Sequence, residues 1–171
     1  MSVWDEFVIM VKEKFGFLET QFGFKLGSTR MPTVDYNSNF YRVSIYWDYG
    51  RKYELELILY TFKKRFFLKL EKDSIELDTL VLMHNPDYKF GDLMPRTNKD
   101  INRELQVFAD LLIEYGKDIL GGDSSDFETF RLIRDEMEAR QLEYRTYYEL
   151  VDAVYRKHSK EHLRNYHRQG K

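Results

Sequence analysis

Apolar and polar side chains alternate between positions 40 and 60, and this alternation predicts the centre of the fold. Apolar residues occupy every second position from Tyr41 to Trp47 and again from Tyr53 to Leu59. Successive side chains of a β-strand point to opposite faces, so each stretch predicts a strand with one buried face.

Two turns connect these stretches to a third. Asp48 to Arg51 contains Gly50 and has the length of a hairpin connection. The basic run Lys63–Arg65 predicts a second turn before a strand at 66–70, and Thr33 to Tyr36 is a plausible first strand. The pattern predicts an antiparallel meander of three to four strands.

Helical spacing appears on both sides of this meander. At the N-terminus, Ser2 is a candidate N-cap for a helix that runs to about Phe17 and packs its apolar stripe on the sheet. Residues 73–84 fit a short helix with a capping box formed by Asp73 and Glu76, although alternation there also permits a strand; we favour the helix.

The second half of the chain reads as helical. A loop at 85–96 precedes a helix that is capped by Thr97 or Asn98 and ends at Gly116. Gly121 and Gly122 form a break. Two further helices follow, roughly 125–141 and 146–167, with capping-box spacings at Ser125/Glu128 and Thr146/Glu149.

The order of these elements indicates a fold class. An N-terminal helix, an antiparallel meander and a helical C-terminal half predict an α+β protein whose helices pack on one sheet face. We expect one domain over 1–171: a helix and sheet in 1–72, then mainly helices in 73–171, with a basic terminal helix at 146–168.

Composition narrows the function classes. The 171 residues are 43% hydrophobic and 33% charged, and they include no cysteine. Disulfides, thiolate catalysis and cysteine-type metal centres are therefore excluded, and we expect no cofactor. The N-terminus carries acids where a signal peptide needs basic residues, and no apolar run is long enough for a transmembrane segment; both predict a cytoplasmic protein.

Charge is distributed unevenly. Residues 156–171 hold six Lys/Arg and one acid, whereas the first 155 hold 21 basic and 28 acidic residues, a net charge of −7. A basic tail on an acidic body suits either a solvated helix end or contact with nucleic acid or an anionic surface. The residues that would contact nucleic acid or an anionic surface are Arg156, Lys157, Lys160, Arg164, Arg168 and Lys171.

One string in this tail matches a metal motif. His158-Ser-Lys-Glu161-His162 fits the inverted zinc-protease pattern, in which two histidines one helical turn apart share a metal. No acid follows Glu161 to act as a third ligand, and the surrounding cations would repel a metal. We therefore expect a solvated helix, and His158 and His162 remain a candidate pair only.

Other catalytic signatures are sparse. The chain has no G-x-S-x-G motif and no phosphate-binding loop, so a hydrolase with an unrecognised site is the last alternative. Glu54 and Glu56 lie two apart on one strand and would project from the face opposite Leu55 and Leu57. They suit either a solvated sheet face or an acidic recognition surface.

Several segments together resemble a known group of proteins. They are Phe15-Gly-Phe17-Leu18, Gln21-Phe-Gly-Phe24, Val34-Asp-Tyr36-Asn-Ser, Val43-Ser-Ile-Tyr-Trp47-Asp, Tyr53-Glu-Leu-Glu-Leu, Leu111-Leu-Ile-Glu-Tyr-Gly116 and Leu120-Gly-Gly-Asp123. The layout over about 15–130 resembles small uncharacterised bacterial α+β proteins, several of them immunity proteins of polymorphic and contact-dependent toxin systems. The resemblance implies a cytoplasmic protein without catalytic residues that inhibits a partner by binding it, and it supplies no site residues.

The residues themselves suggest where such a partner would bind. Toxin domains that cut nucleic acid are often basic, and an acidic, tyrosine-bearing sheet face would steer and block them. The candidate residues for this face are Tyr46, Asp48, Tyr49, Glu54 and Glu56.

Overall fold

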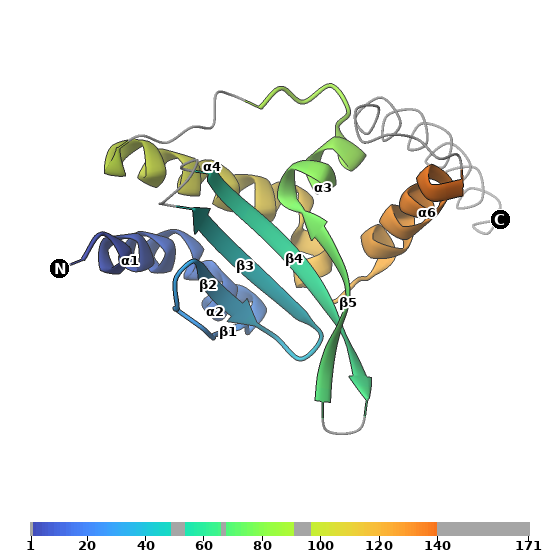
Figure 1. Cartoon of the computed structure of the whole chain (residues 1–171), viewed down its shortest axis with the longest axis horizontal. Helices are drawn as coiled ribbons and strands as arrows, with labels where there is room; N and C mark the ends of the chain where they lie inside the picture. The colour runs from blue at the N-terminus through green and yellow to red at the C-terminus, as the bar shows by residue number, and fades with distance from the viewer. Residues whose placement is uncertain (1, 49–53, 66–67, 91–96, 140–171) are drawn as a thin grey trace.

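The computed structural model describes residues 2–48, 54–65, 68–90 and 97–139, and it is an α+β fold. A twisted antiparallel sheet forms the middle of the molecule, and in the view of Figure 1 some helices lie behind it and others beside it. The predicted fold class is confirmed. No helix among the described residues has both the length and the apolar character needed to cross a bilayer.

The sheet has five strands in sequence order. They are β1 (Lys25–Leu26), β2 (Thr33–Asn37), β3 (Tyr41–Asp48), β4 (Glu54–Arg65) and β5 (Leu68–Glu76). Each pairs antiparallel with the next, and the β4–β5 register shifts between Thr61 and Phe62. Sequential neighbours pair because short connections bring them together first.

The helices flank the sheet in the chain. They are α1 (Val3–Phe15), α2 (Phe17–Phe22), α3 (Leu77–His84), α4 (Asn98–Tyr115), α5 (Lys117–Leu120) and α6 (Ser125–Ala139). Ser2 caps α1, and Thr97 caps α4; each forms a reciprocal capping box with the aspartate three residues later. These caps satisfy backbone N–H groups that the first helical turn leaves without partners.

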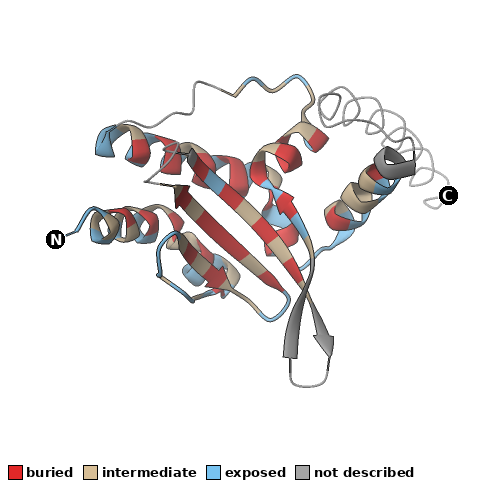
Figure 2. Ribbon diagram, viewed as in Figure 1, coloured by how far each residue is buried: buried red, intermediate tan, exposed pale blue. Residues whose placement is uncertain are grey.

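Buried side chains form continuous rows across the strands. Tyr36, Val43, Leu59 and Ile75 occupy neighbouring register positions, and none of them is more than 1% exposed. The strands accordingly alternate between buried and less buried residues in Figure 2. The apolar stripes of α1 and α4 complete this core, to which Phe7, Val11, Phe15, Leu105, Phe108 and Leu112 contribute.

The second predicted turn is wrong. Lys63, Lys64 and Arg65 belong to β4, where they pair with Leu70, Lys69 and Leu68. The two strands continue as a ribbon away from the rest of the sheet (Figure 1). A basic run is compatible with strand pairing when the strand leaves the core, so it does not by itself mark a turn.

The prediction for 73–84 is right for one part and wrong for the other. A helix does occupy Leu77–His84, but Asp73 lies in β5, which continues to Glu76. Glu76 precedes the helix without any side-chain capping bond, so the predicted capping box does not form. Ile75 decides the outcome, because it is buried opposite Leu59 and holds this segment in the sheet.

Smaller differences concern short elements. The N-terminal helix ends at Phe15 and is followed by α2, and strand β1 was not predicted. Ser125 is the first residue of α6, and its backbone N–H donates to the Asp123 side chain, so the predicted capping box at Ser125 is replaced by this turn. The predictions for the 48–51 hairpin and for a helix at 146–167 fall outside the described residues.

Candidate protein-binding face

One face of the sheet points away from α1 and α4, and we call it the outer face. Alternation assigns to it the strand residues that lie between the buried positions. Glu56, Ser74 and Glu76 on this face are exposed, whereas most of its other residues are half-buried. The described members include Lys25, Thr33, Asp35, Asn37, Arg42, Ser44, Tyr46, Asp48, Glu56, Ile58, Tyr60, Phe62, Ser74 and Glu76.

Carboxylates gather at one end of this face. Glu56 stands directly opposite Tyr46 in the register, and Glu76 stands opposite Ile58, two residues along the same strand. Directly paired strand residues have Cβ atoms about 5 Å apart, so these side chains form one surface. We call Asp35, Tyr46, Asp48, Glu56 and Glu76 the acidic patch.

The structure brings together most of the residues proposed from the sequence. Tyr46 and Asp48 are half-buried, and Glu56 is exposed. Glu54 lies in β4, with its backbone opposite Asp48. Tyr49 lies outside the described residues.

Asp35 and Glu76 belong to the patch, and sequence reasoning missed both. Asp35 accepts a hydrogen bond of 2.6 Å from the Ser44 hydroxyl, which fixes its side chain on the outer face. Alternation within the predicted strand at Thr33–Tyr36 already assigned Asp35 to the face of the strand opposite to that of Val34. Glu76 gave no such signal, because its segment had been read as helix.

Glu76 lies near two other carboxylates. Partial desolvation raises the pKa of its carboxyl group, and the neighbouring carboxylates of Asp78 and Glu56 raise it further. The region therefore favours positive charge, whether a proton or a cationic group of a partner.

The opposite end of the outer face is basic and aromatic. The guanidinium group of Arg42 lies 4.1 Å from the ring centroid of Tyr60 and 5.8 Å from that of Phe62, a cation–π arrangement. Lys25 is exposed on the edge strand β1. The outer face is thus polarised, with its negative end at the C-terminal end of β3.

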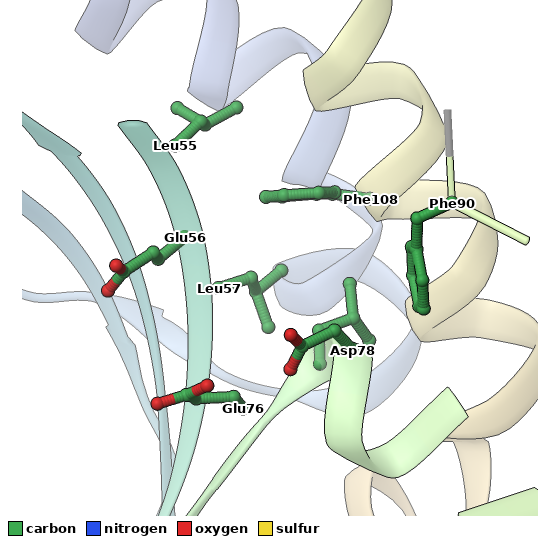
Figure 3. A pocket seen from close by; sticks show the side chains of 8 residues that line it. Leu55, Glu56, Leu57, Glu76, Asp78, Phe90 and Phe108 are labelled. Atoms are coloured by element: carbon green, nitrogen blue, oxygen red, sulfur yellow. The ribbon is translucent and has the colours of Figure 1, made fainter. Parts of the chain in front are cut away.

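An apolar cavity of about 80 Å³ opens beside the acidic patch (Figure 3). Five apolar side chains from β4, α3, α4 and the segment that follows α3 line it: Leu55, Leu57, Leu77, Phe90 and Phe108. Glu56, Glu76 and Asp78 also line it. The lining of the cavity thus combines five apolar side chains with three acidic residues.

A second hollow of about 300 Å³ lies where the sheet meets α6. The Tyr41 hydroxyl donates to the Gly122 carbonyl oxygen at 3.0 Å, and the Asp73 carboxylate accepts from Arg131 at 3.1 Å. These two hydrogen bonds cross the hollow, so we infer that the residues involved connect α6 and the segment before it to the sheet.

Other predicted chemistry falls outside the described residues. His158, His162 and the basic residues Arg156, Lys157, Lys160, Arg164 and Arg168 all lie there. Among the residues that are described, no group of three His, Asp or Glu side chains is arranged to hold a metal ion.

Comparisons with known proteins add no relative from which a role could be carried over. No protein-family model matches the chain, and neither a curated protein nor a solved structure shows significant similarity to it.

Proposed function

We propose that this chain is a non-catalytic protein-binding domain that neutralises a basic partner, such as a bacterial toxin domain, by covering it. The observation that carries the proposal is the acidic patch: four carboxylates and a tyrosine on a sheet face that α1 and α4 leave uncovered. The partner class comes from the resemblance to toxin-immunity proteins, and the surface comes from the fold.

Physical arguments support binding by this face. Clustered charge of one sign accelerates the approach of an oppositely charged protein, and complementary charge disfavours other partners. Tyrosine contributes a large contact area at low entropic cost and is enriched at interfaces. A rigid sheet presents these groups without having to reorganise them.

The resemblance supplies the biological role within the proposal. A protein that inhibits its partner by binding needs no catalytic residue, which is compatible with a patch built from carboxylates and Tyr46. A toxin that cleaves nucleic acid must itself carry a cationic substrate site. The acidic patch would occupy such a site as a mimic of the phosphate backbone.

Affinity purification tests the proposal. The tagged full-length chain is used as bait in the cells that produce it, beside a Glu54→Lys/Glu56→Lys double variant and Tyr46→Ala. Glu114→Lys is the control, because Glu114 is exposed on α4. We expect one stoichiometric protein partner with wild type and the control, at least tenfold weaker binding by the double variant, and association that slows as salt rises.

Unaltered binding by the double variant would rule out this face. If nucleic acid or anionic membrane co-purifies instead, a full-length variant with Gln at Arg156, Lys157, Lys160, Arg164 and Arg168 shows whether the basic tail holds it. Its loss from that variant, with a steep salt dependence, would replace the proposal with the basic-tail function.

A further inference from the structure

The edge of β4 is incompletely paired. On one side β4 pairs with β3 as far as Glu54, but on the other side its pairing with β5 stops at Ile58 opposite Glu76. There the chain turns into α3. Residues 54–57 therefore extend beyond the end of their neighbouring strand.

The hydrogen-bonding direction along this stretch follows from the ladder. The Phe62 N–H donates to the Phe40 carbonyl oxygen at 2.8 Å, so even-numbered residues of β4 point their backbone groups towards β3. Alternate residues of an antiparallel strand point the opposite way. The N–H and C=O groups of Leu55, and the N–H of Leu57, consequently face the side that β5 has left.

On the other side of the sheet, the backbone of β2 remains paired beyond the end of β1. The Gly27 N–H donates to the Asp35 carbonyl oxygen, and the Asp35 N–H donates to that of Ser28. Proteins generally protect sheet edges in this way, because unpaired backbone groups invite pairing with another chain. Among the described residues, none donates to or accepts from the Leu55 backbone on the side of β5.

The apolar cavity lies along the incompletely paired edge. Figure 3 shows Leu55 and Leu57 of β4 on one side and Phe90 on the other, with Phe108 between them. Its volume of about 80 Å³ is roughly half that of an engineered cavity that accommodates benzene, so it suits an aliphatic side chain better than an aromatic ring. A strand placed beside Leu55 would direct alternate side chains into this space.

The carboxylates near this edge indicate which residue type suits the remaining positions of such a strand. Its other side chains would project to the outer face, next to Glu56 and Glu76, with Asp78 at the mouth of the cavity. The carboxylates of Asp78 and Glu56 repel that of Glu76, and a cationic group placed beside Glu76 would relieve this repulsion. The occupant is therefore an extended segment in which aliphatic and basic residues alternate.

We propose that the protein partner contributes an extended segment that adds to the β4 edge at Leu55–Leu57, inserts an aliphatic side chain into the cavity and places basic residues beside Glu56, Glu76 and Asp78. Addition of a strand to an exposed sheet edge is a general mode of peptide recognition. This inference rests on the proposed function, because it specifies how the partner of the acidic patch is held.

Peptide binding to the isotope-labelled full-length chain tests the mode of binding. The probe is the acetylated, amidated heptapeptide Lys-Val-Lys-Val-Lys-Val-Lys. One matched probe carries N-methyl groups on all three valines, whose N–H groups would face β4, and a second has Glu in place of Lys. We expect the Leu55 and Leu57 amide resonances to shift and their hydrogen exchange to slow with the first probe, and at least tenfold weaker binding of the other two.

Several outcomes would overturn the inference. Equal binding of the N-methylated probe would mean a purely electrostatic contact, and shifts confined to residues away from β4 would place the peptide elsewhere. Slow exchange of the Leu55 and Leu57 amides in the free full-length chain would mean that another part of this chain, or a second copy, already occupies the edge.

A cavity-filling variant links the test to the cognate partner. Phe90→Trp enlarges a side chain that lines the cavity, and Phe22→Trp is the control, because Phe22 is half-buried at the end of α2. We expect Phe90→Trp to bind both probe and partner at least tenfold more weakly. Phe22→Trp should bind both as wild type does. If the partner binds Phe90→Trp normally yet is lost with Glu54→Lys/Glu56→Lys, strand addition is wrong and the proposed function stands.

Discussion

The imidazole of His84 on α3 lies 2.9 Å from a carboxylate oxygen of Asp126 on α6 (Nε2–Oδ1), although the two residues are 42 positions apart. This contact joins the helix that follows β5 to the helix that begins after the Gly121–Gly122 break. The hydrogen bond to Asp126 raises the pKa of His84, while burial opposes the rise. The folded state therefore binds the His84 proton more tightly than the unfolded chain does.

His84→Gln should reduce stability in a pH-dependent way. A histidine whose pKa is higher in the folded state stabilises the protein below its unfolded pKa, and this contribution disappears as pH rises through the folded value. We expect a loss of about 0.5–1 kcal/mol at pH 6 and less at pH 9. Urea unfolding at the two pH values measures it, and an equal loss at both would show that the charge does not contribute.

Glu104 on α4 should destabilise the protein at alkaline pH. The residue is 4% exposed, one of its carboxylate oxygens has no hydrogen-bond partner among the described residues, and burial raises its pKa to about 7. Because the folded state favours the protonated acid, stability falls as pH rises from the unfolded pKa through the folded one. Glu104→Gln should therefore stabilise the protein by about 2 kcal/mol at pH 8 and change it little at pH 5.

Glu114→Gln is the matched control for this prediction, since Glu114 is exposed on the same helix. Because the pKa of His84 is raised as well, both profiles are also recorded in the His84→Gln background. A pH profile of Glu104→Gln that runs parallel to that of wild type would contradict the assignment of the titrating group to Glu104.

Phe7→Ala should remove a large part of the stability. Phe7 is fully buried, and its ring centroid lies 4.8 Å from that of Trp47, where α1 packs on the sheet. Truncating a buried phenylalanine costs about 3–5 kcal/mol, because the lost contacts leave a cavity. Phe40→Ala, at a side chain that is 56% exposed, should change stability far less. Similar midpoints for the two variants in urea would mean that α1 does not pack as described.

Gly122→Ala should cost about 1–2 kcal/mol, whereas Gly121→Ala should be close to neutral. Gly122 has φ +108°, a region that residues with a Cβ rarely adopt, and its carbonyl oxygen accepts the Tyr41 hydroxyl. Gly121 has φ −76°, which any residue adopts. Thermal melting of the pair separates backbone strain from a general effect of adding a methyl group, and equal melting temperatures would contradict the strained geometry.

Short-range patterns, such as period-two alternation and N-cap residues, predicted the long strands and the starts of α1 and α4. Alternation placed Val43, Ile45 and Trp47 on the buried face, and the Ser2 and Thr97 caps lay where the helices begin. Glu56 could be assigned to the outer face because Leu55 and Leu57 flank it. The same logic would have assigned Asp35.

Patterns at the ends of elements were ambiguous. The 73–76 segment fits a capped helix as well as a strand, and the basic run at 63–65 is compatible with a turn or a strand. Pairing decided both: Ile75 pairs with the more distant Leu59, and the basic run pairs with 68–70 a few positions further on. Short elements such as α2 and β1 give too few positions for any period to show.

By itself, the sequence determined the fold class, the strand faces, the starts of α1 and α4 and the uneven distribution of charge, because each depends on residues a few positions apart. Tertiary structure alone decided that β5 ends opposite Ile58, since strand register is set by contacts between distant segments. That register places Glu76 near Glu56 and leaves the β4 edge beside an apolar cavity. The candidate binding site is therefore a consequence of pairing across the sheet, which no local pattern records.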